Sequence, residues 1–127
     1  MCLSRITKIY PKRDKTEGFG WKVICDGIQK DTFMFPYYSI NIHHYNKWLR
    51  RIKRIIITNN FEYESGFHIF KNKKDALSYK DRDEKVVRVQ YKGIICSGIQ
   101  ADYRILSVSQ VGSYYNCLVV KQIKVLK

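Results

Sequence analysis

The sequence predicts a single α+β domain that is mostly antiparallel, with about eight short strands and one or two short helices. Three observations lead to this class. Short apolar or alternating runs recur along the 127 residues, turn residues bound them, and only two stretches show helical spacing. The length fits one compact domain over residues 1–127, and neither an internal repeat nor a low-complexity linker divides it.

The first part of the chain is expected to hold a charged loop over 11–18 and then a β-hairpin. Residues 21–25 read Trp-Lys-Val-Ile-Cys, which indicates a strand. Asp26 and Gly27 form a hairpin turn signal, and a second strand is expected over 32–35. The proline that follows ends this strand, because proline has no N–H to donate to a ladder.

The next stretch has two competing patterns. Trp48 and the apolar residues after it recur at helical spacing, with basic residues on the opposite face, which predicts a short helix or helical turn over 46–53. Three consecutive isoleucines then favour a strand near 54–58, because β-branched residues suit a pleated surface. Asn59 and Asn60 are expected to close the unit as a turn.

The second half is expected to alternate one short helix with further strands. Residues 62–70 look extended, and 72–79 indicates a helix that Asn72 caps. Residues 80–85 form a charged loop. The remaining strands are expected over 86–91, 94–96, 105–111, 114–121 and 123–126, with a hairpin turn at Gly112-Ser113.

Charge is the strongest functional signal in the composition. Lys and Arg total 24 against 11 Asp and Glu, which gives a formal net charge of +13 and a pI near 9.7. Self-repulsion of this size is tolerated most easily when an anionic partner is present. A basic footprint of this kind favours a phosphate-bearing ligand, and the alternative is a basic surface that only aids solubility.

Two basic clusters are the candidate binding sites. Guanidinium groups grip phosphates in bidentate fashion and an aromatic ring can stack on a base, which points to the first cluster. The alternative is that its tryptophan belongs to the core and its arginines form a solvated helix face. The second cluster surrounds the start of the short helix, where free N–H groups can hold a phosphate, unless it is an ordinary lysine-rich surface. The first cluster comprises Lys47, Trp48, Arg50, Arg51, Lys53 and Arg54, with Tyr45 beside it, and the second comprises Lys71, Lys73, Lys74 and Lys80.

Cysteines and histidines give weaker signals. The four cysteines, which form no C-x-x-C pair, are Cys2, Cys25, Cys96 and Cys117. Buried free thiols in a reducing compartment explain them better than zinc, so we expect neither a metal nor a cofactor. Removal of Met1 would expose Cys2 as an N-terminal nucleophile, an enzyme hypothesis that lacks an oxyanion-hole motif. Among the histidines, His68 is the best candidate for a chemical role, because it lies in a predicted strand between Phe67 and Ile69.

Sequence motifs also bear on location. The first ten residues lack the continuous apolar stretch of a signal peptide, and no apolar run is long enough to span a membrane. These features predict a cytoplasmic protein without a membrane partner.

Short motifs along nearly the whole chain carry a family resemblance. They are Met1-Cys2-Leu3, Trp21-Lys22-Val23, Lys47-Trp48, Ser65-Gly66-Phe67-His68-Ile69-Phe70, Asp75-Ala76, Val86-Val87-Arg88-Val89 and Val119 to Leu126. The chain resembles a group of small, uncharacterised, phage-encoded proteins. The resemblance implies action inside an infected bacterium as a host-takeover or counter-defence factor, and it implies no catalytic residues.

These observations combine into one leading hypothesis and two alternatives. The leading hypothesis is a non-enzymatic binding protein that recognises a nucleic acid or a nucleotide. The first alternative is an inhibitor that binds an acidic surface of a host or defence protein. The second is the N-terminal cysteine enzyme.

Overall fold

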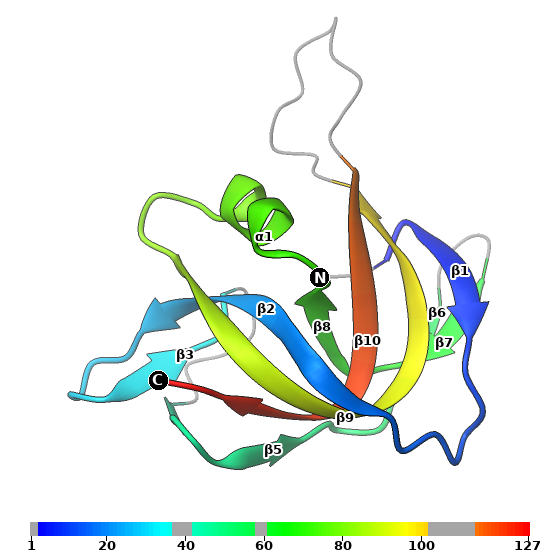
Figure 1. Ribbon diagram of the computed structural model, residues 1–127, viewed down its shortest axis with the longest axis horizontal. Coiled ribbons are helices and arrows are strands. Elements are labelled where there is room, and N and C mark those ends of the chain that lie inside the picture. The colour runs from blue at the N-terminus through cyan, green and yellow to red at the C-terminus, as the bar shows by residue number, and fades with distance from the viewer. Residues whose placement is uncertain (1–2, 37–41, 58–60, 102–113) are drawn as a thin grey trace, which may run out of the picture.

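The structure is a computed structural model that describes residues 3–36, 42–57, 61–101 and 114–127. Within these ranges it contains ten strands and one short helix (Figure 1). The elements are β1 Arg5–Ile9, β2 Glu17–Asp26, β3 Thr32–Met34, β4 His43–His44, β5 Trp48–Arg50, β6 Ile55–Ile57, β7 Glu62–Glu64, β8 Phe67–Phe70, α1 Lys73–Tyr79, β9 Lys85–Ala101 and β10 Tyr114–Val125.

The strand pairings close into a ring. β9 pairs antiparallel with β2 on one side and with β10 on the other, and β10 pairs with β8. β8 returns to β2 through a single pair, Trp21 with Phe70, which makes this the weakest contact of the ring. The described residues therefore form one compact, strand-rich, mostly antiparallel domain, in which β2, β9, β10 and β5 lie side by side (Figure 1).

β9 is one long strand where the sequence predicts two, over 86–91 and 94–96. Gly93 bends it with a φ of +72°, a conformation that a side chain would strain. The half before Gly93 pairs with β2, and the half after it pairs with β1. β9 therefore belongs to the ring through β2 and β10 and also pairs with β1, which lies outside the ring. The predicted strands over 114–121 and 123–126 are likewise continuous, as β10.

The core lies on both faces of the strands. One apolar cluster includes Val89, Leu118 and Ile123, each almost completely buried. The other includes Phe70 and Ala76, so that α1 covers this side of the sheet through its one fully buried residue. The predicted helix is confirmed, and Asn72 caps it by accepting a hydrogen bond from the Asp75 N–H at 3.0 Å.

The helix predicted over 46–53 is wrong. Asn46 turns the chain with a φ of +60°, and β5 then pairs with β10, placing Leu49 opposite the buried Ile123. Pairing with an open strand edge outweighs the helical spacing of the apolar residues, because tertiary context overrides a short local pattern. The described part of the chain therefore has one helix, not two.

The other local predictions divide into confirmed and untested ones. The hairpin at Asp26-Gly27 is confirmed, since the Gly27 N–H donates to the Thr32 carbonyl at 2.9 Å and β2 pairs with β3. The strand predicted near 54–58 is confirmed as β6. The strand over 105–111 and the turns at Asn59-Asn60 and Gly112-Ser113 lie outside the described residues.

Candidate functional site

The first basic cluster is divided by the alternation of β5. Trp48 and Arg50 share one face of this strand, and Leu49 points to the other. Trp48 is partly buried and lies between two lysines: Lys92 Nζ is 4.3 Å from the centre of its ring and Lys124 Nζ is 4.9 Å. Both distances are within the range of a cation–π interaction. Both cations come from other strands, β9 and β10, and neither belongs to the cluster that the sequence predicts around Trp48.

Strand register places Trp48 at the end of a row that crosses four strands. Residues directly opposite one another in antiparallel strands share a face, so a chain of such pairs defines one row. The row runs from Phe19 in β2 through Gln90 in β9 and Lys124 in β10 to Trp48 in β5. At the usual strand spacing its ends are roughly 14 Å apart.

A second ring–cation arrangement flanks this row. Trp21 pairs in register with Arg88, and the guanidinium of Arg88 lies 4.6 Å from the centre of the exposed Phe19 ring. Lys73 of α1 approaches the Trp21 ring at 5.3 Å. We define the ring–cation face as Phe19, Trp21, Trp48, Arg88, Lys92 and Lys124.

The ring–cation face carries a net positive charge. Lys92 has one acidic neighbour, because Glu17 lies opposite it in register with its carboxylate 3.4 Å from Lys92 Nζ. Within the described residues, Arg88 and Lys124 have no ion-pair partner. Their charges are therefore available to an anionic ligand.

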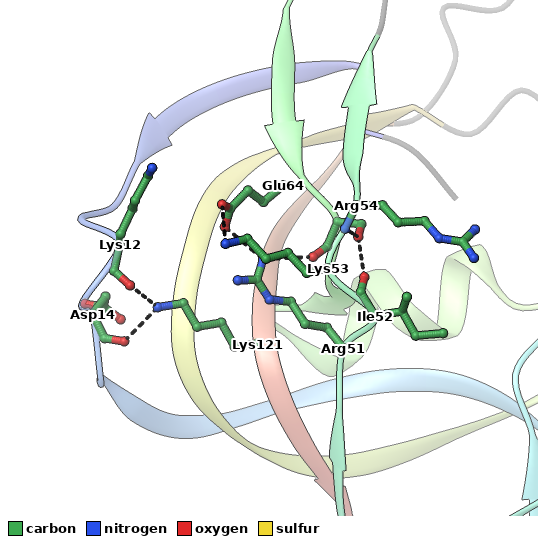
Figure 2. Close-up of polar contacts among 9 residues, drawn as sticks. Lys12, Asp14, Arg51, Ile52, Lys53, Arg54, Glu64 and Lys121 are labelled. Carbon is green, nitrogen blue, oxygen red and sulfur yellow. Dashed lines mark hydrogen bonds and ion pairs between the residues drawn. The ribbon is translucent and has the colours of Figure 1, made fainter.

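Arg51 and Lys53 have a structural role that the sequence does not reveal. Arg51 Nη1 donates to Glu64 Oε2 at 2.9 Å and to the Ser65 carbonyl at 3.2 Å, while Lys53 Nζ lies 3.7 Å from Glu64 Oε1 (Figure 2). The hydrogen bond from Arg51 keeps the pKa of the Glu64 carboxyl below its usual value. Arg54 is exposed, and its guanidinium points away from Glu64. Two of the predicted phosphate-binding cations are thus already partnered.

The second cluster lies at α1, as predicted, on exposed Lys71, Lys73 and Lys74. The start of this helix is poorly suited to a phosphate, because the Asn72 side chain already caps it and Asp75 adds an acid in the first turn. Lys73 still borders the ring–cation face through Trp21. Phosphate binding at this helix remains a prediction.

A pocket of about 510 Å³ lies beside the ring of strands, lined by residues of both β2 and β8. These strands pair only at Trp21 and Phe70, and the residues that line the pocket come from the part where no pair is formed. Apolar side chains supply much of its wall. They include Phe35, Leu49, Ile56 and Phe67.

Lys22 brings a cation into this pocket. Its ammonium donates to the His68 carbonyl at 2.8 Å and lies 5.0 Å from the centre of the Phe35 ring. Burial lowers the pKa of Lys22 to about 8. No acid among the described residues pairs with it. Arg50, Arg51 and Arg54 also line the pocket and add to its positive character, whereas burial lowers the pKa of His43, which lines it as a neutral ring.

His68 is buried and lines the same pocket. Burial, and then the nearby charge of Lys22, lowers the pKa of His68 to about 3, so the ring is neutral at physiological pH. Its Nε2 lies 3.4 Å from the Tyr63 hydroxyl, which accepts a hydrogen bond from the Leu3 N–H at 3.1 Å. Cys2 lies outside the described residues, so the N-terminal cysteine hypothesis remains a prediction.

The cysteine thiols and the arrangement of possible metal ligands bear on which chemistry the described residues can perform. Cys96 and Cys117 are buried and free, as predicted, and burial raises their thiol pKa values to about 11 and about 12. Such thiols are poor nucleophiles, since the thiolate is the reactive form. In the described ranges, no group of three His, Cys, Asp or Glu side chains is placed to hold a metal, and no helix is long and apolar enough to cross a membrane.

Sequence reasoning missed several residues that the structure brings together. Phe19, Lys92 and Lys124 join the ring–cation face, and Lys22 enters the pocket. Alternation over 86–91 does place Arg88 and Gln90 on one face, but it does not say which strands lie alongside. Comparison with known proteins adds no relative: no family model, curated protein or solved structure matches the chain.

Proposed function

We propose that this protein binds single-stranded nucleic acid across the ring–cation face. The observation that carries the proposal is the row of Phe19, Gln90, Lys124 and Trp48, in which rings at both ends flank an amide and an ammonium. Proteins that bind single strands combine aromatic platforms for bases with cations that follow the backbone. The face supplies both.

The geometry favours a single strand over a duplex. The face is built from strand residues, with no helix among its members to enter a major groove. Phe19 keeps 54% of its surface exposed, and exposed rings gain most from unpaired bases. The resemblance to phage-encoded proteins would place this activity in an infected bacterium, as a host-takeover or counter-defence function.

Intrinsic fluorescence tests the proposal directly, because both tryptophans of the chain lie on the ring–cation face. Titration with a homothymidine oligonucleotide should quench this fluorescence through stacking. With one phosphate neutralised by each of Arg88, Lys92 and Lys124, affinity should fall about 20-fold between 50 and 200 mM salt. A salt-independent affinity, or unchanged tryptophan emission at saturation, would reject the proposal.

Two variants separate stacking from charge. Trp48→Ala should weaken binding by roughly 5- to 100-fold at fixed salt and leave the salt slope unchanged, because a stacked base contributes about 1–3 kcal/mol. Lys124→Gln should instead reduce the salt slope by about 0.7, the value for one phosphate contact on a single strand. Lys30→Gln, an exposed change in the β2–β3 turn, is the matched control and should alter neither quantity.

A further inference from the structure

The pocket between β2 and β8 differs from the ring–cation face in shape and lining. Its volume of about 510 Å³ falls within the range of small-molecule sites, and apolar side chains such as Phe35 and Phe67 line it. A nucleic-acid backbone is polar along its whole length and gains little from such walls. The pocket therefore suits a compact ligand with an apolar body.

Lys22 indicates the charge of that ligand. Its ammonium has three donor hydrogens, and the described residues provide one hydrogen-bond acceptor, the His68 carbonyl. Lys22 is half-buried, and a cation partly withdrawn from water without a counter-ion costs stability, which an anion that arrives with a ligand would offset. The other ionisable groups that line the pocket are mainly cationic or neutral, with Glu84 as the one acid among the described lining residues.

We propose that this pocket is a binding site for a small organic anion with an apolar body. The anionic head contacts Lys22 Nζ, and the body packs against the Phe35 and Phe67 side chains. A carboxylate and a phosphate monoester share this chemistry. This site is independent of the proposed nucleic-acid function, since it uses no member of the ring–cation face.

A pair of fluorescent probes tests the proposal. 8-Anilinonaphthalene-1-sulfonate carries an anion on an apolar body, and N-phenyl-1-naphthylamine is its uncharged parent. Lys22→Met should weaken binding of the sulfonate on the order of 10- to 100-fold, because a charge-assisted hydrogen bond is lost, and should leave binding of the uncharged dye unchanged. Lys124→Met, the same substitution on the ring–cation face, should bind both dyes as the unchanged protein does.

Several results would overturn the proposal. Equal sulfonate affinity in Lys22→Met and the unchanged protein would show that Lys22 does not hold the anion. An equal loss of affinity for both dyes in Lys22→Met would show that the pocket has collapsed. The test is then repeated with Lys22→Gln, whose folding is checked by circular dichroism. If Lys22→Gln also loses both dyes equally, the proposal fails.

Displacement by decanoate and by decyl phosphate identifies the preferred head group. If neither displaces the sulfonate dye, the pocket does not take this ligand class. A saturating homothymidine oligonucleotide should leave the dye bound, so failure of this site and failure of the nucleic-acid face are distinguishable.

Discussion

The ring–cation face and the pocket each contain a lysine ammonium close to an aromatic ring, but the surroundings of the two ammonium groups differ. On the face, Lys124 lies 4.9 Å from the centre of the Trp48 ring and keeps part of its surface in solvent. In the pocket, Lys22 lies 5.0 Å from the centre of the Phe35 ring, and burial lowers its pKa to about 8. The ring distance is nearly equal and both residues are half-buried, so what differs is the place of the ammonium: Lys22 Nζ lies in the pocket and donates to a backbone carbonyl there. A solvated cation is available to a ligand at little cost, whereas a buried one costs stability until an anion reaches it.

The same contrast exists within a few residues of sequence. Arg51 and Arg54 both line the pocket, but Arg51 is held by Glu64 and the Ser65 carbonyl, while the Arg54 side chain is exposed and points away from Glu64. Basic residues that look equivalent in the sequence therefore divide into structural cations and available ones. Three stability measurements test this division.

The largest effect is expected at His68, on the pocket side. Its pKa is about 3 in the folded protein and about 6.5 in an unfolded chain. As the pH falls below 6.5, the unfolded chain takes up a proton that the folded protein does not, so acid favours unfolding. The free energy of unfolding should drop by about 3 kcal/mol between pH 6.5 and pH 4 through this residue.

Urea titrations across this pH range measure the effect. His68→Gln, which cannot be protonated, should lose much less stability on acidification than the unchanged protein. His44→Gln, a change at an exposed ring on β4, is the control and should keep the full acid loss. Identical pH profiles for His68→Gln and the unchanged protein would show that protonation of the buried His68 ring does not control acid unfolding.

A smaller effect is expected at the two arginines. Arg51→Ala leaves the partly buried Glu64 carboxylate and the Ser65 carbonyl without their donor, and should lower the free energy of unfolding by about 2 kcal/mol. Arg54→Ala should change it by less than about 0.5 kcal/mol, as expected for a surface substitution. Thermal or urea unfolding of both variants is the measurement. Equal losses would remove the distinction between structural and available cations.

The sequence predicts local elements of this fold better than their partners. The α1 helix, its Asn72 cap and the β2–β3 hairpin are confirmed because each depends on a few neighbouring residues. The helix over 46–53 fails because the edge of β10 pairs with residues 48–50, and no local pattern specifies that contact.

For the candidate site as well, the sequence shows the residues but does not show which of them lie together. The cations at the Trp48 ring are Lys92 and Lys124 and not its sequence neighbours, because the pairing of β9, β10 and β5 sets which side chains lie beside it. Lys22 lies in an alternating strand where the sequence indicates no pocket. Lys22 lines the pocket beside the stretch where β2 and β8 form no pair, a feature of tertiary geometry.

The smallest effect, and the most direct test of the lysine in the pocket, is the alkaline response of Lys22. The unfolded chain holds this proton to a pH of about 10.4, and the folded protein releases it near pH 8. Between these values folding releases a proton, so raising the pH favours the folded state. The free energy of unfolding should rise by about 1 kcal/mol through this residue, with allowance for the solvent that reaches the pocket.

Urea unfolding of two matched variants isolates this contribution from the other lysines and the tyrosines. Lys22→Met should be more stable than the unchanged protein at pH 7, because it removes the buried charge, and this advantage should shrink as the pH rises above 8. Lys124→Met removes an equal charge from the ring–cation face and should show neither the gain nor its pH dependence. If both variants respond alike, the pocket does not set Lys22 apart from Lys124, and the argument for an anionic ligand at Lys22 fails.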